Sequence, residues 1–462
     1  MTETSYLSEA QIVDLPSDSS TDGRLNALRR AREAMQATAQ WYTGQAMGRR
    51  WGVGCVALEI TQRCNLDCTL CYLSEHAEAV QDTPLPEIIR RIDAIHARYG
   101  DRTDVQVTGG DPTLRKREEL IQIVREIAAR NMRPSLFTNG IRATRSLLSD
   151  LAEAGLCDVS FHVYMTQQRK GYACESELNS IRREYLERAR GLGLYIIFNT
   201  TVFDENIEEI PALTRWFLTH ADQVSFASFQ MQAETGRGVL GQRDAALTRD
   251  RVISAIETGA ESRLGFGVLQ SGHRSCNAYA VALTTGSKTI PFYDDAPLFQ
   301  ELMDRTATLP VDRQSPLRVA RTFIAWGLRN PSILSRIVGN FFHKLQKLTP
   351  ALLMSRGRMN RISFFVHNFM DACHLEEERV KSCVFMVESA QGGVSMCVHN
   401  AKRDATILQP LRIMTDHGIG FWDPTTGDVT NSQGQHLPSV DLSPKQLKGR
   451  RKFASKQAAE SL

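Results

Sequence analysis

The amino-acid sequence predicts an α/β barrel followed by an α+β extension. The first observation is a repeat between residues 51 and 240, where short apolar runs alternate with amphipathic stretches at intervals of roughly 30 residues. Such repeats form parallel strands joined by right-handed helical crossovers. The second observation is size, because 462 residues with a hydrophobic fraction of 42% can build one large core and one or two smaller units.

Each repeat supplies one strand and one helix. The predicted strands cover residues 56–60, 104–108, 134–138, 158–164, 195–201 and 223–229. The predicted helices between them cover residues 84–98, 116–130, 145–154, 177–192 and 207–220. In such folds the chemistry collects at the carboxyl ends of the strands. The segments expected there are a cysteine-containing loop, the turn at 109–112, Asn139-Gly140 and residues 230–238.

Composition and pattern divide the rest of the chain into six segments. We expect a disordered N-terminus over residues 1–23 and a helix over 24–50, before the barrel of 51–240. The later segments are an extension with Cys276 over 241–312, a basic amphipathic helical segment over 313–370, an auxiliary cluster region over 371–440 and a flexible basic tail over 441–462.

The ten cysteines indicate a reducing compartment, in which such residues bind metals more often than they form disulfides. The polar N-terminus does not resemble a signal peptide, and no run of 18 apolar residues is present. We therefore expect the protein in the cytoplasm, with peripheral association at the inner face of the membrane. The net charge of +3 identifies no partner by itself.

Three cysteines follow the first predicted strand, at Cys64, Cys68 and Cys71. Thiols spaced by three and then two residues in a loop can hold three corners of a cubane iron–sulfur cluster and leave the fourth iron free for a small molecule. Zinc usually takes four ligands in close pairs, and the nearest further candidate, His76, has the wrong spacing. The motif therefore indicates an iron–sulfur cluster.

This cysteine spacing, the aromatic Tyr72 after it and the turn Gly109-Gly110-Asp111-Pro112 resemble the radical S-adenosylmethionine (SAM) superfamily, over residues 51–238. The resemblance implies a partial (β/α)6 barrel that holds a [4Fe–4S] cluster on three cysteines, with the amino and carboxylate groups of SAM on the open iron. It implies reductive cleavage of SAM to a 5′-deoxyadenosyl radical, which abstracts hydrogen from a substrate. A low-potential electron donor, flavodoxin or ferredoxin, is then expected as a partner.

The same resemblance assigns cofactor contacts. Tyr72 would contact adenine, and the backbone of Gly109, Gly110, Asp111 and Pro112 would approach SAM, although the family pattern has Glu at the position of Asp111. Asn139 lies at the same predicted edge, and Ser160, His162 and Asn199 could meet the ribose or carboxylate of SAM or fill the barrel mouth. Arg237 could pair with the SAM carboxylate or be a solvated loop residue. No catalytic residue is identified.

Four later cysteines predict an auxiliary [4Fe–4S] cluster, at Cys276, Cys373, Cys383 and Cys397. Cys383 and Cys397 bracket a predicted hairpin over residues 384–398, which would bring them close together. His399 could substitute for one ligand, and reduced cysteines without metal are the alternative. Cys55 and Cys157 are expected in the core, and Cys174 has no assigned role.

Residues 313–370 contain ten Lys or Arg and no Asp or Glu. One predicted helical face is apolar, with Ile333, Leu334, Ile337, Val338, Phe341, Phe342, Leu345 and Leu348. The opposite face is basic and polar, with Arg336, Asn340, His343, Lys344 and Lys347. This pattern suits a membrane interface or acyl chains, and equally a helix that packs on the barrel. No aromatic-interleaved motif supports nucleic-acid binding.

Two classes of substrate follow. The stretch from His367 to Asp371, with Cys383 and Cys397 to Asn400, loosely resembles a group that contains the archaeal tetraether-lipid synthase and pterin methyltransferases. That resemblance implies hydrogen abstraction from a lipid acyl chain and carbon–carbon bond formation. The alternative is a peptide-modifying maturase or a pterin-type small-molecule methyltransferase or cyclase. A scaffold or sensor without turnover is the non-enzymatic hypothesis.

Overall fold

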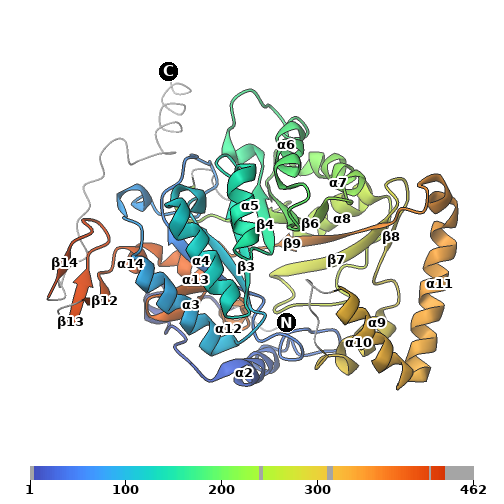
Figure 1. Ribbon diagram of the computed structural model, residues 1–462, viewed down its shortest axis with the longest axis horizontal. Helices are drawn as coiled ribbons and strands as arrows, with labels where there is room; N and C mark the ends of the chain where they lie inside the picture. Colours follow the sequence, from blue (N-terminus) through green and yellow to red (C-terminus); the bar gives the residue numbers. More distant parts are fainter. Residues whose placement is uncertain (1–4, 239–242, 310–315, 416–417, 432–462) are drawn as a thin grey trace.

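A mainly parallel sheet flanked by helices forms the centre of this computed structural model, which describes residues 5–238, 243–309, 316–415 and 418–431 (Figure 1). The six predicted strands are all present, as β1 (Cys55–Thr61), β2 (Asp104–Gly109), β3 (Arg133–Thr138), β4 (Asp158–His162), β5 (Tyr195–Val202) and β6 (Val224–Met231). The predicted alternation of strands and helices is therefore confirmed.

The five predicted helices are also present, with ends that differ by a few residues: α3 (Leu85–Tyr99), α4 (Arg117–Ala129), α5 (Arg145–Glu153), α6 (Asn179–Ala189) and α7 (Ile210–Thr219). A further helix, α8 (Arg249–Ala260), packs beside α7. Short 3-10 helices lie at η1 (Ala77–Ala79), η2 (Pro112–Leu114), η3 (Met165–Gln167) and η4 (Ile207–Glu209).

The chain after β6 adds strands to both edges of the same sheet. β9 (Asn360–His367) pairs in parallel with β6, and β10 (Phe385–Ser389) pairs in parallel with β1. β7 (Asn277–Thr284), β8 (Thr289–Pro291) and β11 (Gly392–Ser395) continue these edges in antiparallel pairs. The order is β11-β10-β1-β2-β3-β4-β5-β6-β9-β7-β8. The predicted boundary at residue 240 is therefore wrong as a division of the fold, because the extension completes the barrel sheet on both sides.

The two faces of the sheet differ in polarity, because successive side chains of a strand point to opposite faces. One face packs into the main core through residues such as Leu58, Val107, Val159 and Phe198, all fully buried. The other face lines a cavity with side chains from β1 to β6, β9 and β10: Ala57, Glu59, Gln106, Thr108, Ser135, Phe137, Ser160, His162, Ile197, Asn199, Phe226, Gln230, Phe365, His367 and Phe385. The sequence alternation thus makes an apolar outer face and a mixed inner face.

The N-terminal expectations are wrong for the described residues. Residues 5–22 are ordered: α1 (Glu9–Asp14) begins with a capping box at Ser8, and two bridges join Tyr6 to Glu376 and Asp18 to Gly393. Ile12 is also buried in an apolar cluster with Leu375 and Val394, so the segment is held by apolar contacts with the distant extension as well as by the bridges. The helix predicted over 24–50 is α2 (Gly23–Ala37), which ends where Ala39 adopts a φ of 54°.

The basic segment forms α10 (Pro316–Leu328) and α11 (Pro331–Met354), which stand with α9 (Ala296–Arg305) at one side of the molecule (Figure 1). Its last part, residues 360–367, is strand β9 rather than helix, because Ile362, Phe364 and Val366 alternate into the core. Within the described ranges, no helix is both long and apolar enough to cross a membrane.

The predicted hairpin is confirmed as β10 and β11, although its second arm becomes helix α13 (Met396–Ala401) at Met396. It lies after α12 (Glu377–Lys381) and before α14 (Arg403–Ile407). A separate small sheet follows, with β12 (Leu411–Thr415), β13 (Gly418–Trp422) and β14 (Val429–Thr430). The predicted tail over 441–462 and the end of the 371–440 region lie outside the described residues.

Candidate functional site

The three cysteines of the loop after β1 come together at the carboxyl edge of the sheet. Their side chains are half-buried, and burial raises the pKa of Cys64 to about 11 and that of Cys68 well above its usual range. The negative charge of each neighbouring thiolate raises these pKa values further. The loop thus gathers three thiols that need a positive partner to ionise.

In the described part of the chain, no three or more His, Cys, Asp or Glu side chains converge closely enough to hold a single metal ion. A cubane cluster has a different requirement, because each of its thiolates binds a separate iron and the sulfurs stay apart. Cys64, Cys68 and Cys71 fit that donor set: they are soft ligands, near enough to influence one another electrostatically.

Arg237 supplies the positive charge at this loop. Its side chain is 1% exposed and hydrogen-bonds the Cys71 thiol. Burial opposes its charge, but the Cys71 thiolate and Glu78 raise the guanidinium pKa. The segment that carries Arg237 is fixed over the loop, since its backbone N–H donates to Leu73 at 2.7 Å and that of Gly238 donates to Cys71 at 3.1 Å. The alternative of a solvated loop arginine is therefore wrong.

The two glycines of the 109–112 turn allow a close backbone crossing. A Cβ on Gly109 would lie 2.0 Å from the carbonyl oxygen of Thr61, and a Cβ on Gly110 would lie 2.0 Å from that of Arg63. Gly109 also has a φ of +125°, which side chains rarely adopt. Gly109 and Gly110 are therefore needed so that the turn can pass close to the backbone of Thr61 and Arg63, where the cysteine loop begins.

Asp111 is fully buried and joins two strand ends. Its carboxylate accepts hydrogen bonds from Thr113 N at 3.0 Å, Asn139 N at 2.9 Å and Thr138 Oγ1 at 2.9 Å. Burial raises the pKa of Asp111, although these donors oppose the shift. The side chain therefore connects β2 to β3, and the following Pro112 starts η2. The shorter Asp turns the chain as expected.

Asn139 holds the cysteine loop from the end of β3. Its Nδ2 donates to Asn65 Oδ1 at 2.7 Å and lies 4.0 Å from Cys64 Sγ. Its Oδ1 accepts from Ile141 N at 3.0 Å. The side chain is thus placed beside a candidate cluster ligand.

A buried ion pair between Glu59 and Arg403, next to the Tyr72 ring, was not predicted from the sequence. The Tyr72 hydroxyl donates to the carbonyl oxygen of Gly109 at 2.5 Å, and the Arg403 guanidinium lies 4.8 Å from its ring centre. Arg403 pairs with Glu59 at 2.7 Å, and His399 Nε2 lies 3.3 Å from the same carboxylate. Although burial opposes its charge, Arg403 and His399 hold the pKa of Glu59 well below its usual range. The polar Glu59 within an apolar strand was the only signal in the sequence.

A cavity of about 320 Å³ begins at Cys71 and Tyr72 and extends along the inner face of the sheet. Ser160, His162 and Asn199 line it as expected. Ser160 Oγ and His162 Nε2 are buried without a hydrogen-bond partner among the described residues, so both can serve a bound molecule. Burial lowers the pKa of His162 to about 4, and this ring is therefore neutral at pH 7.

Aromatic residues of the extension line another part of this cavity. The His367 ring contacts Phe369, with ring centres 3.8 Å apart, and Phe385, with ring centres 4.4 Å apart, both in tilted arrangements. The ring centres of Phe365 and Phe226 lie 6.0 Å apart. Burial lowers the pKa of His367 to about 3. The strands that the extension adds to the sheet thus supply aromatic residues to the cavity wall, beside Phe137 and Phe226 of the barrel.

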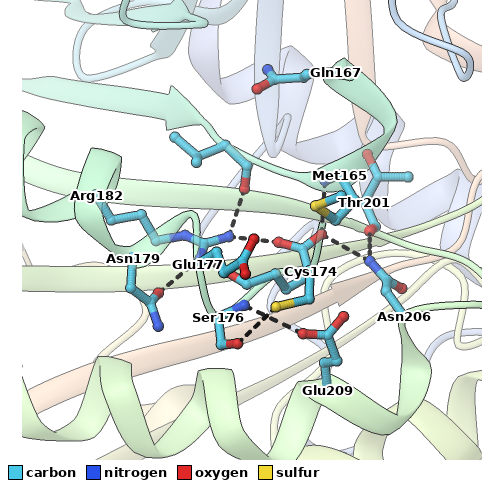
Figure 2. A network of polar contacts seen from close by, with 12 residues as sticks. Met165, Gln167, Cys174, Ser176, Glu177, Asn179, Arg182, Thr201, Asn206 and Glu209 are labelled. Carbon is cyan, nitrogen blue, oxygen red and sulfur yellow. Dashed lines mark hydrogen bonds and ion pairs between the residues drawn. The ribbon is translucent and has the colours of Figure 1, made fainter. Parts of the chain in front are cut away.

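A polar network supports the cysteine loop from the side of η3. Glu175 and Arg182 are both fully buried and paired at 2.7 Å, and the Glu175 carboxylate also accepts from Met165 N at 2.9 Å and Asn206 Nδ2 at 3.0 Å. Figure 2 shows Met165, Arg182 and Asn206 gathered in this network. The adjacent Thr166 carbonyl accepts from Thr69 N, inside the cysteine motif, at 2.8 Å. The network therefore positions the cysteine loop.

The candidate auxiliary cysteines are brought together only in part. Cys276, Cys383 and Cys397 lie close enough for burial and one another's charge to raise the pKa values of Cys276 and Cys397, the former to about 11. Arg379 Nε donates to Cys276 Sγ at 3.3 Å. Cys55, expected only as a core residue, is buried beside Cys383.

Two expected auxiliary ligands lie elsewhere. Cys373 is exposed, with its sulfur 3.0 Å from His374 Nδ1, because the turn from Asp371 to His374 faces solvent. His399 cannot substitute, since it faces Glu59. Among the other cysteines, Cys157 is buried in the core and Cys174 contacts Ser176.

The comparisons with known proteins agree with this geometry. Residues 58–217 match the model of the radical SAM superfamily. A 7,8-dihydro-6-hydroxymethylpterin dimethyltransferase of Methanocaldococcus jannaschii is 25% identical over 39% of this chain and 36% of its own length. A PqqA peptide cyclase of Bradyrhizobium diazoefficiens is 26% identical over 38% and 46%, and a GTP 3′,8-cyclase of Streptomyces coelicolor is 30% identical over 44% and 60%.

Among solved structures, SuiB of Streptococcus suis bound to S-adenosylmethionine aligns with a TM-score of 0.32 and 14% identity, over 41% of this chain and 44% of that one. The chain spans between about a third and three fifths of the length of these curated relatives.

Proposed function

Because residues 58–217 place this chain in the radical SAM superfamily, we propose that it is a radical SAM enzyme whose substrate lies in the cavity of the sheet. The observation that carries the proposal is the convergence of Cys64, Cys68 and Cys71 at one end of that cavity, beside the buried Arg237. When bound, a [4Fe–4S] cluster on these thiols supplies the electron that cleaves S-adenosylmethionine to a 5′-deoxyadenosyl radical. A low-potential donor, flavodoxin or ferredoxin, would deliver that electron.

The residues of the chain prepare the site in four ways. Arg237 offsets the charge of the thiolates, and Asn139 keeps the cysteine loop against β3. Ser160 and Asn199 offer polar groups inside the cavity to the polar atoms of SAM. The aromatic wall at Phe365 and Phe385 excludes water, which a radical that attacks C–H bonds requires.

A peptide side chain or a small molecule is the first candidate substrate. The relatives with similar sequences are named for a peptide, a pterin and GTP, and the cavity carries polar groups beside its apolar wall. A lipid acyl chain is the second candidate. It is favoured by the apolar cavity wall and by exposed apolar residues on α10 and α11.

The proposed activity is tested by reductive cleavage of SAM. Anaerobically reconstituted protein, reduced with dithionite and mixed with SAM, is expected to form 5′-deoxyadenosine, measured by liquid chromatography and mass spectrometry. The same protein without reductant should form none. Protein that contains its clusters and is reduced, yet forms no 5′-deoxyadenosine, would contradict the proposal.

An auxiliary [4Fe–4S] cluster on Cys276, Cys383 and Cys397 is proposed from the proximity of their thiols. Reconstituted protein is then expected to hold about eight irons per chain, and the Cys383→Ala variant about four. Iron and sulfide assays measure both values. Cys373→Ala serves as the matched control, because its thiol lies apart from the group, and it should keep about eight. About four irons in the unsubstituted protein would rule out the second cluster.

Replacement of Arg237 by Gln is expected to lower the reduction potential of the cluster on Cys64, Cys68 and Cys71. One positive charge beside the thiolates is lost, and the more negative, reduced state depends most on it. A redox titration followed by electron paramagnetic resonance measures the potential. Arg243→Gln is the control, since Arg243 binds Gln232 and Asn368 instead of a thiol. An unchanged potential in Arg237→Gln would show that the guanidinium does not act on the cluster.

A further inference from the structure

Helices α10 and α11 carry more than half of the large hydrophobic side chains that are exposed in the described residues. We define the α10–α11 face by its six central members: Leu317, Ile324, Leu328, Phe341, Phe342 and Leu345. Leu317, Ile324 and Leu328 follow one another at helical spacing on α10, and the other three lie within one turn and a half of α11. The two helices pack together, since Leu334 of α11 lies against Gly327 of α10.

A different part of the α11 surface holds this helix to the protein, through the buried side chains of Ile333, Lys344 and Leu348. Lys344, expected on the basic face of the helix, is buried, pairs with Asp294 and lies 5.1 Å from the ring centre of Phe299. Arg336 pairs with Glu301 of α9. Phe341 and Phe342 lie outside this buried set and are 54% and 56% exposed. The α10–α11 face is not needed to attach the helices to the fold.

The charge around the face has one sign. Residues 313–370 carry ten Lys or Arg and no acid. Lys344 and Arg336 are used in the ion pairs above, whereas the exposed Arg318, Arg321 and Lys347 form none with any described residue. Arg318 and Arg321 lie on the same helix as the exposed Leu317 and Ile324. An apolar face is thus bordered by cations that lack partners in the described chain.

We propose that the α10–α11 face docks on an anionic lipid surface, with its apolar side chains at the level of the acyl chains and its cations at the headgroups. An amphipathic hairpin of this composition lies in the membrane interface without crossing it. A second copy of the chain fits less well, because a symmetric contact would bring the unpaired cations of both copies together. Docking is independent of the substrate and of SAM cleavage, so its failure and that of the proposed function can be told apart.

Co-sedimentation of the full-length protein with lipid vesicles tests the proposal. Vesicles of phosphatidylcholine with phosphatidylglycerol are expected to bind the protein, and vesicles of phosphatidylcholine alone to bind it at least about tenfold less. Added salt should weaken the binding, because it screens exposed charges. The double variant Phe341→Ser and Phe342→Ser should lose about tenfold or more in affinity, since two large apolar side chains no longer leave water.

Two controls distinguish docking from misfolding and from non-specific hydrophobic adsorption to vesicles. Leu25→Ser removes an exposed apolar side chain of α2, 82% exposed, and should bind anionic vesicles like the unsubstituted protein. The double variant should keep the circular dichroism spectrum and the iron content of that protein. Equal binding of the double variant and the unsubstituted protein would overturn the proposal. So would a dimer, seen by light scattering, that dissociates in the double variant while neither protein binds vesicles.

Discussion

Replacement of Cys64 by Ala is expected to reduce the formation of 5′-deoxyadenosine to the background measured without reductant. The cluster requires three thiolates from the loop, and the described residues near Cys64 offer Asn65 and Asn139 rather than another soft ligand. Iron analysis should show the loss of one cluster in the same variant. The same outcome is expected for Cys68→Ala and Cys71→Ala.

Cys174→Ala provides the matched control for these variants. Cys174 is half-buried like the three cysteines of the loop after β1, but its sulfur contacts Ser176, beside the Glu175 network. Its replacement should leave SAM cleavage and iron content unchanged. Full activity in Cys64→Ala would exclude the three-cysteine site as the origin of the radical.

Replacement of Glu175 by Leu is expected to lower the free energy of unfolding by about 3–5 kcal/mol, because it leaves the fully buried Arg182 without its counter-ion. The loss should appear in urea unfolding followed by circular dichroism. Glu175 also accepts from Met165 and Asn206, so η3 should become mobile and the cysteine loop should lose its bond from Thr69 to Thr166. Slower reconstitution of the cluster is therefore expected as well.

An exposed ion pair on α6, the helix that carries Arg182, provides the comparison for the loss of stability. Glu184 pairs with Arg188 and is 58% exposed, and Glu184→Leu should change the free energy of unfolding by less than about 1 kcal/mol. The double variant Glu175→Leu and Arg182→Met should recover much of the stability, since no unpaired buried charge remains. Equal effects of Glu175→Leu and Glu184→Leu would show that the buried pair has no special role.

The local pattern predicted the strands and helices of the barrel, because alternation and helical spacing are properties of neighbouring residues. It also placed Cys64, Cys68 and Cys71 in one loop at the carboxyl edge of the sheet. What the pattern could not predict is how distant segments meet. The β9 and β10 strands complete the sheet by pairing with β6 and β1, across long stretches of chain. The N-terminal residues are ordered for the same reason, through contacts with residues near 376 and 393.

The candidate site also depends on side-chain contacts between distant segments, which the local pattern could not predict. Asp111 matches the expected turn, yet its carboxylate is used by Thr113, Thr138 and Asn139. The Glu59–Arg403 pair joins residues 344 positions apart, and no local signal connects them. Helical spacing placed Lys344 on the basic face of the predicted helix, but its pairing with Asp294 depends on a residue 50 positions away. Hydrogen-bond and ion-pair partners that come from distant parts of the chain cannot be inferred from the spacing of residues along one segment.

The most direct test of the three-cysteine site is the electron paramagnetic resonance spectrum of the reduced cluster with and without SAM. The variant Cys276→Ala and Cys383→Ala is suited to it, because the signal of an auxiliary cluster should be absent. We expect SAM to change the spectrum, since the iron without a protein ligand is open to its amino and carboxylate groups. A spectrum that is identical with and without SAM would contradict the assignment of Cys64, Cys68 and Cys71 as the ligands of a SAM-binding cluster.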